Sequence, residues 1–453
     1  MVFIALCFVL LSLPLAVFNW EENVVSEIDN RQLTNNPFGP NAKPGADLTA
    51  SLESYVQDRI GFRDEMILGY TLPNAQLFHK MIHPLYEYGK DGYVFFKQKQ
   101  NVQFGDYHIA FAEMLAEIQD YCQARDVPFL FVLNPEKAAV YPDKLRDGIH
   151  YDRSWVQQFE EKLDKLGVNY IDNTQLLQDR RAEGEQVFNK VYNAGHWNDL
   201  GAFYGVNNIL ESLSGFFPSI QPNELSDFAV NETLQETLLS SQFPIHEYEP
   251  TFGRLCELEV KTEEYDAEVA RSSQHRGFGY FVNPENVAAG APKTLVFQGS
   301  YMNEMGFKFL QTGLGEYIYV HNYENLMDFD YYFNIFQPEC VVVEVAEYTV
   351  NSGYFNAERV ENFSLNPVLT LDDAARQADK QSLAPQIAEG ERLSTLTVSL
   401  PEGTRYAYLL SEGRTFDLIE GEQGWQASVE KENLSADYTV VAVGADGEQT
   451  RYR

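Results

Sequence analysis

The sequence has few cysteines, and they follow no pattern. Its four cysteines, Cys7, Cys122, Cys256 and Cys340, are scattered over 453 residues. None belongs to a Cys-x-x-Cys pair or a Cys/His cluster, so the spacing indicates neither a disulfide framework nor a zinc site. The histidines also lack metal-ligand spacing. We therefore expect no metal and no organic cofactor.

Positive charge is scarce. The chain has 33 Lys and Arg against 67 Asp and Glu, a formal net charge of −34. Binding to phosphates needs clustered positive charge, so a nucleic-acid partner is not expected. Hydrophobic residues make up 44% and charged residues 22%, which is the composition of a globular protein rather than a disordered one.

One long hydrophobic run opens the chain. Residues Val2 to Phe18 are almost wholly apolar. The length of this run is at the lower limit for a helix that spans a bilayer. We predict a signal anchor or transmembrane segment over residues 1–19, with the rest of the chain extracytoplasmic at the cell membrane. A cleaved signal peptide and a buried core helix are the alternatives. Residues 20–50 are rich in Asn, Pro and Gly and predict an extended tether.

Strand and helix patterns alternate through residues 51–365. Continuous apolar runs such as Thr294 to Gln298 are typical of strands covered on both faces. We predict an α/β fold, a three-layer α/β/α sandwich around a parallel sheet. Residues 215–290 are irregular and predict an insertion. Further strands are expected at Val127–Leu133, Glu316–His321 and Cys340–Val345, and helices at His108–Arg125, Ser154–Leu166 and Asn198–Leu213.

The C-terminal part has a different pattern. Residues 366–385 are rich in Ala, Asp and Gln and predict a linker. Residues 386–453 contain short β runs separated by turn residues, such as Pro401-Glu402-Gly403. They predict a small all-β domain.

Two residues stand where ligands bind in parallel α/β sheets, beyond the carboxyl ends of strands. Ser300 follows the strand Thr294 to Gln298, and Gly299 before it permits a tight turn. His196 precedes Asn198, which is a suitable cap for the next helix. A serine needs a base such as histidine to become a nucleophile. Taken singly, however, such a serine is more often a turn residue or helix cap, and such a histidine a packed one.

Seven segments, in order, resemble the SGNH-hydrolase-like domain of the alginate O-acetylation proteins and of the related DHHW proteins of Gram-positive bacteria. The resemblance spans residues 25–365, and no single segment is specific. The segments are Glu27–Leu33, Asp58–Arg63, Gly89–Phe96, Asn134–Pro142, His196–Ala202, Leu295–Tyr301 and Pro338–Tyr348.

The resemblance implies an acyl-serine mechanism. It makes Ser300 the nucleophile and His196 the general base. A membrane-bound O-acyltransferase would supply the acetyl group, and a hydroxyl of an extracellular polysaccharide would receive it. Backbone amides near Gly299 and Ser300 would stabilise the oxyanion, and Trp197 and Tyr301 could stack on a sugar ring.

Two aspartates of the family pattern are replaced. Gln298 stands before Gly299, and Ala194 occupies the position two residues before His196. Asn193 lies three residues before the histidine, which is the spacing of wider SGNH hydrolases, and it can orient the imidazole without adding charge. Asp199, Glu344 or Glu347 could supply a carboxylate; Glu347 is preferred because it follows a strand, although a structural carboxylate is its commoner role.

The expected function is therefore an extracytoplasmic O-acetyltransferase acting on a cell-surface or secreted polysaccharide. With water as the acceptor, the same residues would make a carbohydrate acetylesterase. Alternatively, the missing aspartates mark a catalytically inactive SGNH-like protein that binds polysaccharide or serves as a scaffold in an export and modification complex. The distance between Ser300 and His196 distinguishes an enzyme from a scaffold.

Overall fold

The computed structural model describes residues 17–26, 31–42, 47–78, 80–83, 85–97, 102–238, 241 and 243–453. The predicted signal anchor, residues 1–19, lies outside the described residues except for its last three. Within the described ranges, no helix combines the length and apolar character needed to cross a bilayer.

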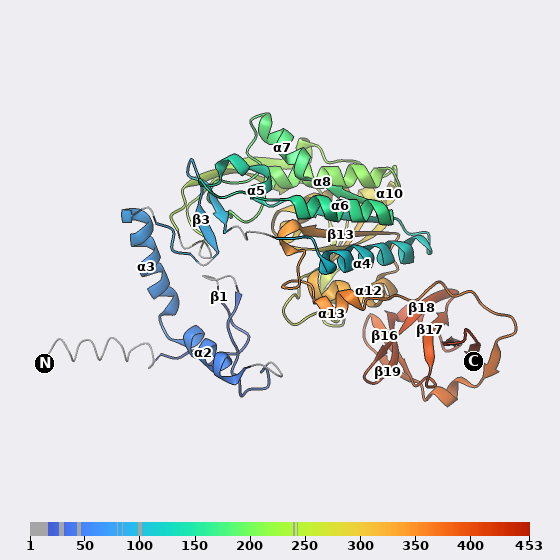
Figure 1. Ribbon diagram of the computed structural model, residues 1–453. Helices are drawn as coiled ribbons and strands as arrows, with labels where there is room; N and C mark the ends of the chain where they lie inside the picture. Colours follow the sequence, from blue (N-terminus) through green and yellow to red (C-terminus); the bar gives the residue numbers. More distant parts are fainter. Residues whose placement is uncertain are drawn as a thin grey trace.

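A seven-stranded mixed sheet forms the centre of the molecule (Figure 1). Five neighbouring strands pair in parallel, and the two further strands at one edge join by antiparallel pairing. This confirms the predicted α/β class. The strand order is β6 (Tyr170–Asp172), β5 (Phe129–Asn134), β13 (Cys340–Ala346), β11 (Lys293–Gln298), β12 (Glu316–His321), β10 (Phe278–Val282) and β9 (Glu259–Val260).

The two antiparallel strands come from the stretch that the sequence pattern assigned to an insertion. Both β9 and β10 belong to the central sheet, so residues 215–290 are not wholly an insertion. The hairpin of β7 (Phe228–Gln235) and β8 (Glu247–Arg254) does lie apart from that sheet.

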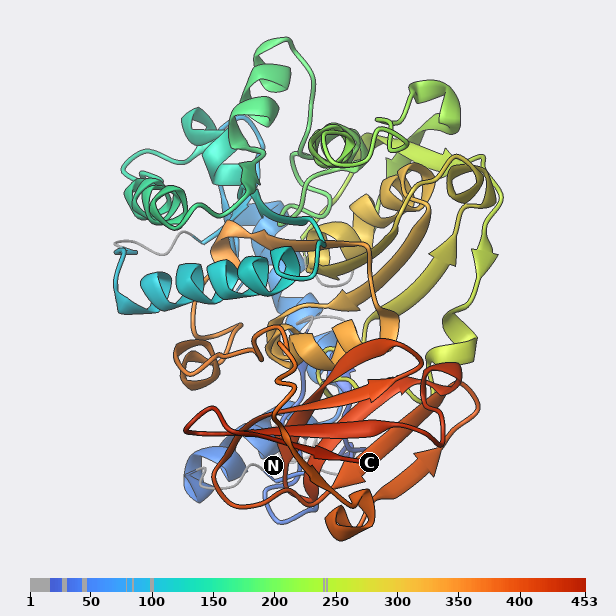
Figure 2. The ribbon, with the colours of Figure 1, turned by 90° about the vertical axis from the view of Figure 1, so that its right-hand side faces the viewer.

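Both faces of the sheet are buried under helices (Figure 2). Alternate residues of β5 show this, because side chains along a strand point to opposite faces. Phe129 and Phe131 pack in one core beside α4 (Asp106–Gln123) and α6 (Ser154–Leu166). Leu130 packs in a second core beside α8 (Asp199–Ser214). The result is the predicted three-layer sandwich.

Other elements complete these layers or precede them. Around the sheet lie α5 (Lys137–Val140), α7 (Thr174–Ala182), α9 (Thr262–Tyr265), α10 (Pro284–Ala288), α11 (Phe307–Gly313), α12 (Phe329–Phe336) and α13 (Ala357–Glu361). Nearer the N-terminus are β1 (Val25–Ser26), β2 (Arg31–Gln32), α2 (Leu48–Arg59), α3 (Arg63–Phe78), β3 (Tyr86–Tyr88) and β4 (Val94–Phe96).

The C-terminal residues form a separate, curled eight-stranded sheet with its own core. It includes Arg376–Ala378, which pairs with the last strand, so the sheet begins earlier in the chain than the sequence pattern indicated. Its strands are β14 (Arg376–Ala378), β15 (Gln386–Glu389), β16 (Leu393–Val398), β17 (Thr404–Ser411), β18 (Arg414–Gly421), β19 (Gly424–Glu430), β20 (Thr439–Gly444) and β21 (Gln449–Tyr452).

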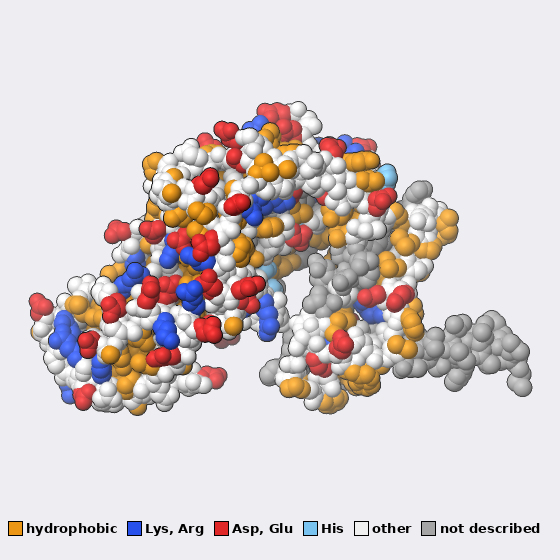
Figure 3. All heavy atoms as spheres, turned by 180° about the vertical axis from the view of Figure 1, so that it is seen from behind, with side chains coloured by type: hydrophobic (Ala, Val, Ile, Leu, Met, Phe, Trp, Pro, Cys, Tyr) orange, Lys and Arg blue, Asp and Glu red, His pale blue; other side chains and the backbone are white. Residues whose placement is uncertain are grey.

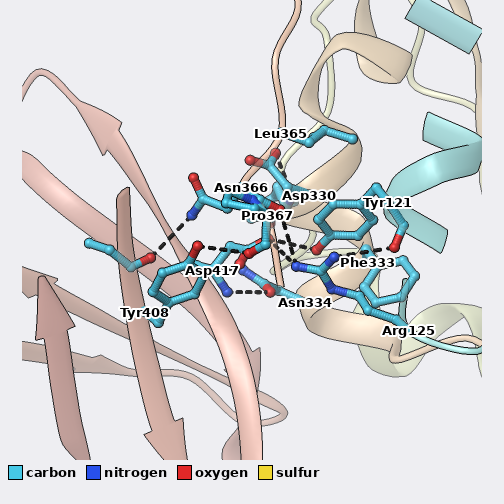
Figure 4. A network of polar contacts seen from close by, with 12 residues as sticks. Tyr121, Arg125, Asp330, Phe333, Asn334, Leu365, Asn366, Pro367, Tyr408 and Asp417 are labelled. Atoms are coloured by element: carbon cyan, nitrogen blue, oxygen red, sulfur yellow. Dashed lines mark hydrogen bonds and ion pairs between the residues drawn. The ribbon is translucent and has the colours of Figure 1, made fainter. Parts of the chain in front are cut away.

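A buried polar network joins this β region to the α/β domain (Figure 4). Asp417 of β18 is almost fully buried and accepts a 2.6 Å hydrogen bond from the Tyr121 hydroxyl of α4. The guanidinium of Arg125 lies 3.5 Å from the same carboxylate. Asn334 of α12 exchanges two hydrogen bonds with the backbone of Asp417. Asp417 is therefore a buried link between the β region and the α/β domain, beside further contacts such as those of Glu268 with the Glu391 and Leu393 amides.

We predict that Arg125→Met lowers stability by about 3 kcal/mol at pH 8, because it leaves the buried Asp417 without a cation. Burial raises the pKa of Asp417 and brings that of neighbouring Asp330 to about 7. In the unfolded chain such a carboxyl group loses its proton at about pH 3.9, whereas in the folded protein it keeps the proton to higher pH. Its contribution to the free energy of unfolding therefore falls as the pH rises.

Urea unfolding at pH 5 and pH 8 checks this prediction. The loss in Arg125→Met should be larger at pH 8. Lys165→Met, which removes a solvent-exposed ion pair with Glu161, should change stability little at either pH. Equal losses in Arg125→Met at both pH values would contradict the electrostatic explanation.

Candidate active site

Ser300 stands where the polypeptide leaves β11 and turns into a helix. This is the carboxyl end of the parallel strands, the edge at which ligands bind in such sheets. The helix starts with a π-helical turn, Met302–Gly306, before α11. π-Helical turns are rare in proteins, and many of those that occur lie at functional sites.

His196 lies in the loop that precedes α8. Asn198 ends the loop as the predicted helix cap, since its side chain accepts a hydrogen bond from the Gly201 amide at 2.9 Å. At the start of the loop, buried Lys137 donates hydrogen bonds to the carbonyl oxygens of Val94 and Lys190. The loop is therefore fixed at both ends before it presents the imidazole.

The structure brings Ser300 and His196 together. The imidazole Nε2 is 2.9 Å from the Ser300 hydroxyl, and Nδ1 is 2.9 Å from Oδ1 of Asn193. Asn193 donates its amide to the Glu304 carboxylate at 2.7 Å. A carboxylate only accepts, so this contact turns Oδ1 of Asn193 toward the histidine and places the imidazole proton on Nδ1. The free Nε2 lone pair then accepts from the serine hydroxyl.

Glu304 is the carboxylate that the sequence analysis missed. Its Oε2 lies 3.7 Å from Nδ1 of His196. It comes from the π-helical turn just after the serine, and its side chain is 42% exposed. A chain of contacts therefore runs from Ser300 through His196 and Asn193 to Glu304. Asn193 carries no negative charge, and Glu304, the next residue in this chain of contacts, supplies one.

Residues 87–289 match the family described as the SGNH hydrolase-like domain of the acetyltransferase AlgX. This protein contains an SGNH hydrolase-like domain. The matched range holds Asn193 and His196 but ends before Ser300, so the place of the serine comes from the structure. Comparison with curated proteins finds no match.

Several solved structures are similar to this chain at low identity. Bacillus cereus PatB1 with a sulfonyl adduct is 14% identical, covering 62% of this chain and 98% of that chain, with a TM-score of 0.47. A DHHW family protein from Eubacterium siraeum is 14% identical, covering 62% of this chain and 100% of that chain, with a TM-score of 0.42. Pseudomonas aeruginosa AlgX is 15% identical, covering 81% of this chain and 89% of that chain, with a TM-score of 0.41. Residue roles in the SGNH hydrolase-like domain therefore follow from its own contacts.

Glu347, the preferred carboxylate of the sequence analysis, has other partners. It accepts hydrogen bonds from the Glu136 amide at 2.8 Å and the Tyr151 hydroxyl at 2.5 Å, and it pairs with Arg153 at 2.8 Å. These partners hold both carboxylate oxygens, and no hydrogen bond joins the described side chains of Glu347 and His196. Glu347 is a structural carboxylate in this domain. Asp199, another candidate, pairs with Lys308.

The expected aromatic stacking platform does not exist. Trp197 and Tyr301 are both fully buried. The Trp197 indole donates to the carbonyl oxygen of Tyr301, whose hydroxyl donates to that of Pro135. These rings hold the histidine loop against the serine helix instead of contacting a sugar.

The backbone amide of Gly299, expected to stabilise the oxyanion, already has another hydrogen-bond partner. It donates to the buried Glu344 carboxylate at 2.8 Å. The Ser300 amide, in contrast, makes no hydrogen bond to any described residue. The Tyr348 hydroxyl lies 3.3 Å from the serine oxygen. Burial raises the pKa of Tyr348 well above its usual value, so this phenol stays a proton donor. Tyr348 ends one of the motifs that carry the family resemblance.

The side chains of Ser300, His196 and Tyr348 open onto a cavity of about 2660 Å³. Its lining includes Ser300, His196 and Tyr348 on one side and residues of α2, such as Leu48 and Ser51, on the other. The charged side chains on its wall are mainly acidic: Glu136, Asp152, Glu304 and Glu347, against Lys97 and Arg276. No group of three or more metal-ligating side chains occurs in the part of the chain that the structure describes.

We predict that Gly201→Ala displaces the start of α8 and lowers stability by about 2 kcal/mol, because the added methyl group would overlap the backbone of Val187. Gly69→Ala is the matched control, since no atom lies within 4 Å of the new methyl group. It should leave stability unchanged or raise it by about 0.5 kcal/mol. Thermal unfolding of both variants checks this; similar losses in both would contradict it.

Proposed function

We propose that this protein is an extracytoplasmic O-acetyltransferase that moves an acetyl group through Ser300 onto a hydroxyl of a cell-surface or secreted polysaccharide. One observation carries the proposal: the hydroxyl of Ser300 lies 2.9 Å from Nε2 of His196, in a chain of contacts that leaves Nε2 free to accept the proton. An inactive scaffold would not need this alignment, so the enzyme is favoured.

The first half-reaction loads the serine. Ser300 Oγ attacks the acetyl carbonyl carbon while His196 Nε2 takes the hydroxyl proton. The Tyr348 hydroxyl and the Ser300 amide stabilise the oxyanion. The intermediate collapses, the donor's leaving group departs with the proton from His196, and the acetyl group remains on Ser300.

The second half-reaction unloads it. His196 removes the proton from a sugar hydroxyl, whose oxygen attacks the acetyl carbon. Collapse releases the acetylated sugar, and the proton returns from His196 to Ser300 Oγ. If water takes the place of the sugar, the protein is an acetylesterase. Glu304, linked to the imidazolium through Asn193, offsets its positive charge in both half-reactions.

Charge and sequence support a choice of acceptor and donor. A mainly acidic cavity wall disfavours a polyanion, so we propose a polymer without net negative charge. The apolar run Val2 to Phe18 supports a single membrane anchor, with a membrane-bound O-acyltransferase as the acetyl donor.

The acyl-serine is tested with a chromogenic acetyl ester and intact-protein mass spectrometry. The wild type should release product and gain about 42 Da transiently, as expected for one acetyl group. Ser300→Ala and His196→Ala should lose both signals, whereas Ser226→Ala, at an exposed and remote serine, should keep them. Equal background from all four proteins would refute the proposal. Faster turnover with added oligosaccharide would identify a transferase.

The proposed role of Glu304 is tested by moving its negative charge to position 193. Glu304→Gln should lower kcat/KM by about tenfold, less than the roughly 10⁴-fold loss in a triad whose aspartate becomes asparagine, because the charge here acts indirectly. The double variant Asn193→Asp/Glu304→Gln moves the charge to position 193 and should regain activity. Glu263→Gln, with the same loss of charge at an exposed site, is the control. A double variant no better than Glu304→Gln would contradict this role.

A further inference from the structure

Two histidines meet at the same edge of the sheet as Ser300. His321 ends β12 and is in register with Gln298 of β11, two residues before Ser300. His275 lies just before β10, which pairs antiparallel with β12 and therefore begins at this edge. The two imidazole rings lie 4.9 Å apart, centre to centre, and both residues line the cavity onto which Ser300 opens. The cavity thus has a second group of polar side chains, one strand away from the serine.

Buried Asn325 holds the two histidines in place. Its side-chain amide donates hydrogen bonds to the carbonyl oxygens of His275 at 2.8 Å and His321 at 2.7 Å. Its Oδ1 accepts from the Ser272 amide at 2.7 Å and from the Tyr332 hydroxyl at 3.2 Å. One side chain therefore fixes the backbone under both imidazoles before a ligand arrives, which lowers the cost of binding.

The ring nitrogens of this pair lack partners. Nδ1 of His275 and Nδ1 of His321 are buried without a hydrogen bond to any described residue. Nε2 of each ring also has no described partner but remains accessible, and both side chains are only half-buried. Buried polar groups are nearly always hydrogen-bonded, so two unpaired imidazoles on a cavity wall indicate a place for a polar ligand.

Both imidazoles are neutral near pH 7. Burial lowers the pKa of His275, and burial together with the neighbouring His275 lowers the pKa of His321 to about 4. A neutral imidazole offers one donor and one acceptor, and a hydroxyl group also does both, so a hydroxyl suits Nε2 in either tautomer. Figure 3 shows Lys and Arg interspersed with Asp and Glu, without a broad basic patch among the described residues on that face. The pair therefore favours an uncharged ligand that carries hydroxyl groups.

Tyrosine rings connect the histidines to the serine along the cavity wall. The ring of Tyr323 lies 4.7 Å from that of His321 and 5.1 Å from that of Tyr354. Tyr354 lies 5.8 Å from Tyr348, whose hydroxyl is 3.3 Å from the Ser300 oxygen. All of these residues line the cavity. Aromatic rings with a few placed polar groups are typical of ligand pockets, and a sugar ring presents both hydroxyl groups and apolar C–H faces.

We propose that His275 and His321 bind hydroxyl groups of an uncharged sugar residue in the acceptor polysaccharide, beside the sugar that receives the acetyl group from Ser300. The tyrosine rings support the chain between the two positions. Because these rings separate the histidines from Ser300, a ligand that reaches both must be longer than an acetyl group, as an oligosaccharide is. The inference rests on the proposed function for the polysaccharide acceptor and adds the residues that recognise it.

Isothermal titration calorimetry tests the site on the full chain carrying Ser300→Ala, so that binding is measured without chemistry. The probes are cellopentaose, mannopentaose and chitopentaose, with pentagalacturonate as the acidic comparison. At least one neutral probe should bind, and more tightly than pentagalacturonate. His275→Asn and His321→Asn withdraw the polar group from the position of Nε2 and should each weaken that binding by about tenfold.

Matched variants separate hydrogen bonding from packing. His275→Gln and His321→Gln keep a polar atom at the distance of Nε2 and should each weaken binding by less than about threefold. His246→Asn, at an exposed histidine outside the cavity lining, should not change it. A second measurement needs no variant of the pair: diethyl pyrocarbonate modifies accessible imidazoles, and the bound neutral probe should protect His275 and His321 but not His246.

Each other result overturns the inference. If no neutral probe binds, the pair is not a sugar site, and tighter binding of pentagalacturonate would assign the wall beside exposed Arg276 to an acidic polymer. Equal losses in the Asn and Gln variants, or histidines that the probe does not protect, would leave the imidazoles a packing role. Acetyl-ester turnover by the wild type reports separately on the chemistry: its absence, with sugar binding intact, would refute the acyl-serine and leave this site standing.

Discussion

Glu344 joins the strand ends on which the active site depends. It lies fully buried in β13, accepts the Gly299 amide beyond β11 and the Asn134 side chain at the end of β5, and its carbonyl oxygen accepts from Asn322 beyond β12. Burial raises its pKa to about 7 despite these donors. Four parallel strands are tied at their carboxyl ends through this one residue, which fixes the turn that carries Ser300.

The histidine side of the site is fixed by packing. Fully buried Trp197 and Tyr301 join the loop of His196 to the helix of Ser300. Rigid support of this kind keeps a nucleophile and its base aligned before substrate arrives. Glu304 lies in the same helix as Ser300, so one short segment carries both the proposed nucleophile and the carboxylate that contacts Asn193. A site that lacks the usual aspartate can thereby keep a charge near its imidazole.

Much of this could be predicted from sequence, for identifiable reasons. Buried strands such as Thr294 to Gln298 are continuous apolar runs, and helix Ser154–Leu166 was predicted with its observed bounds. The spacing of Asn193 and His196 indicated their contact. Glu304 was missed because its approach to Asn193 depends on a π-helical turn that no local pattern announces. Trp197 and Tyr301 were misjudged because adjacency to a candidate catalytic residue does not reveal whether a ring is buried.

The proposed chemistry depends most directly on whether Ser300 is an activated nucleophile. Methanesulfonyl fluoride reacts with serines that have a base within reach, so the labelled protein can be digested and the modified residue mapped by mass spectrometry. We predict one methanesulfonyl group, on Ser300, formed in the wild type and much more slowly in His196→Ala. Labelling that is spread over exposed serines, or that proceeds equally fast in His196→Ala, would contradict it.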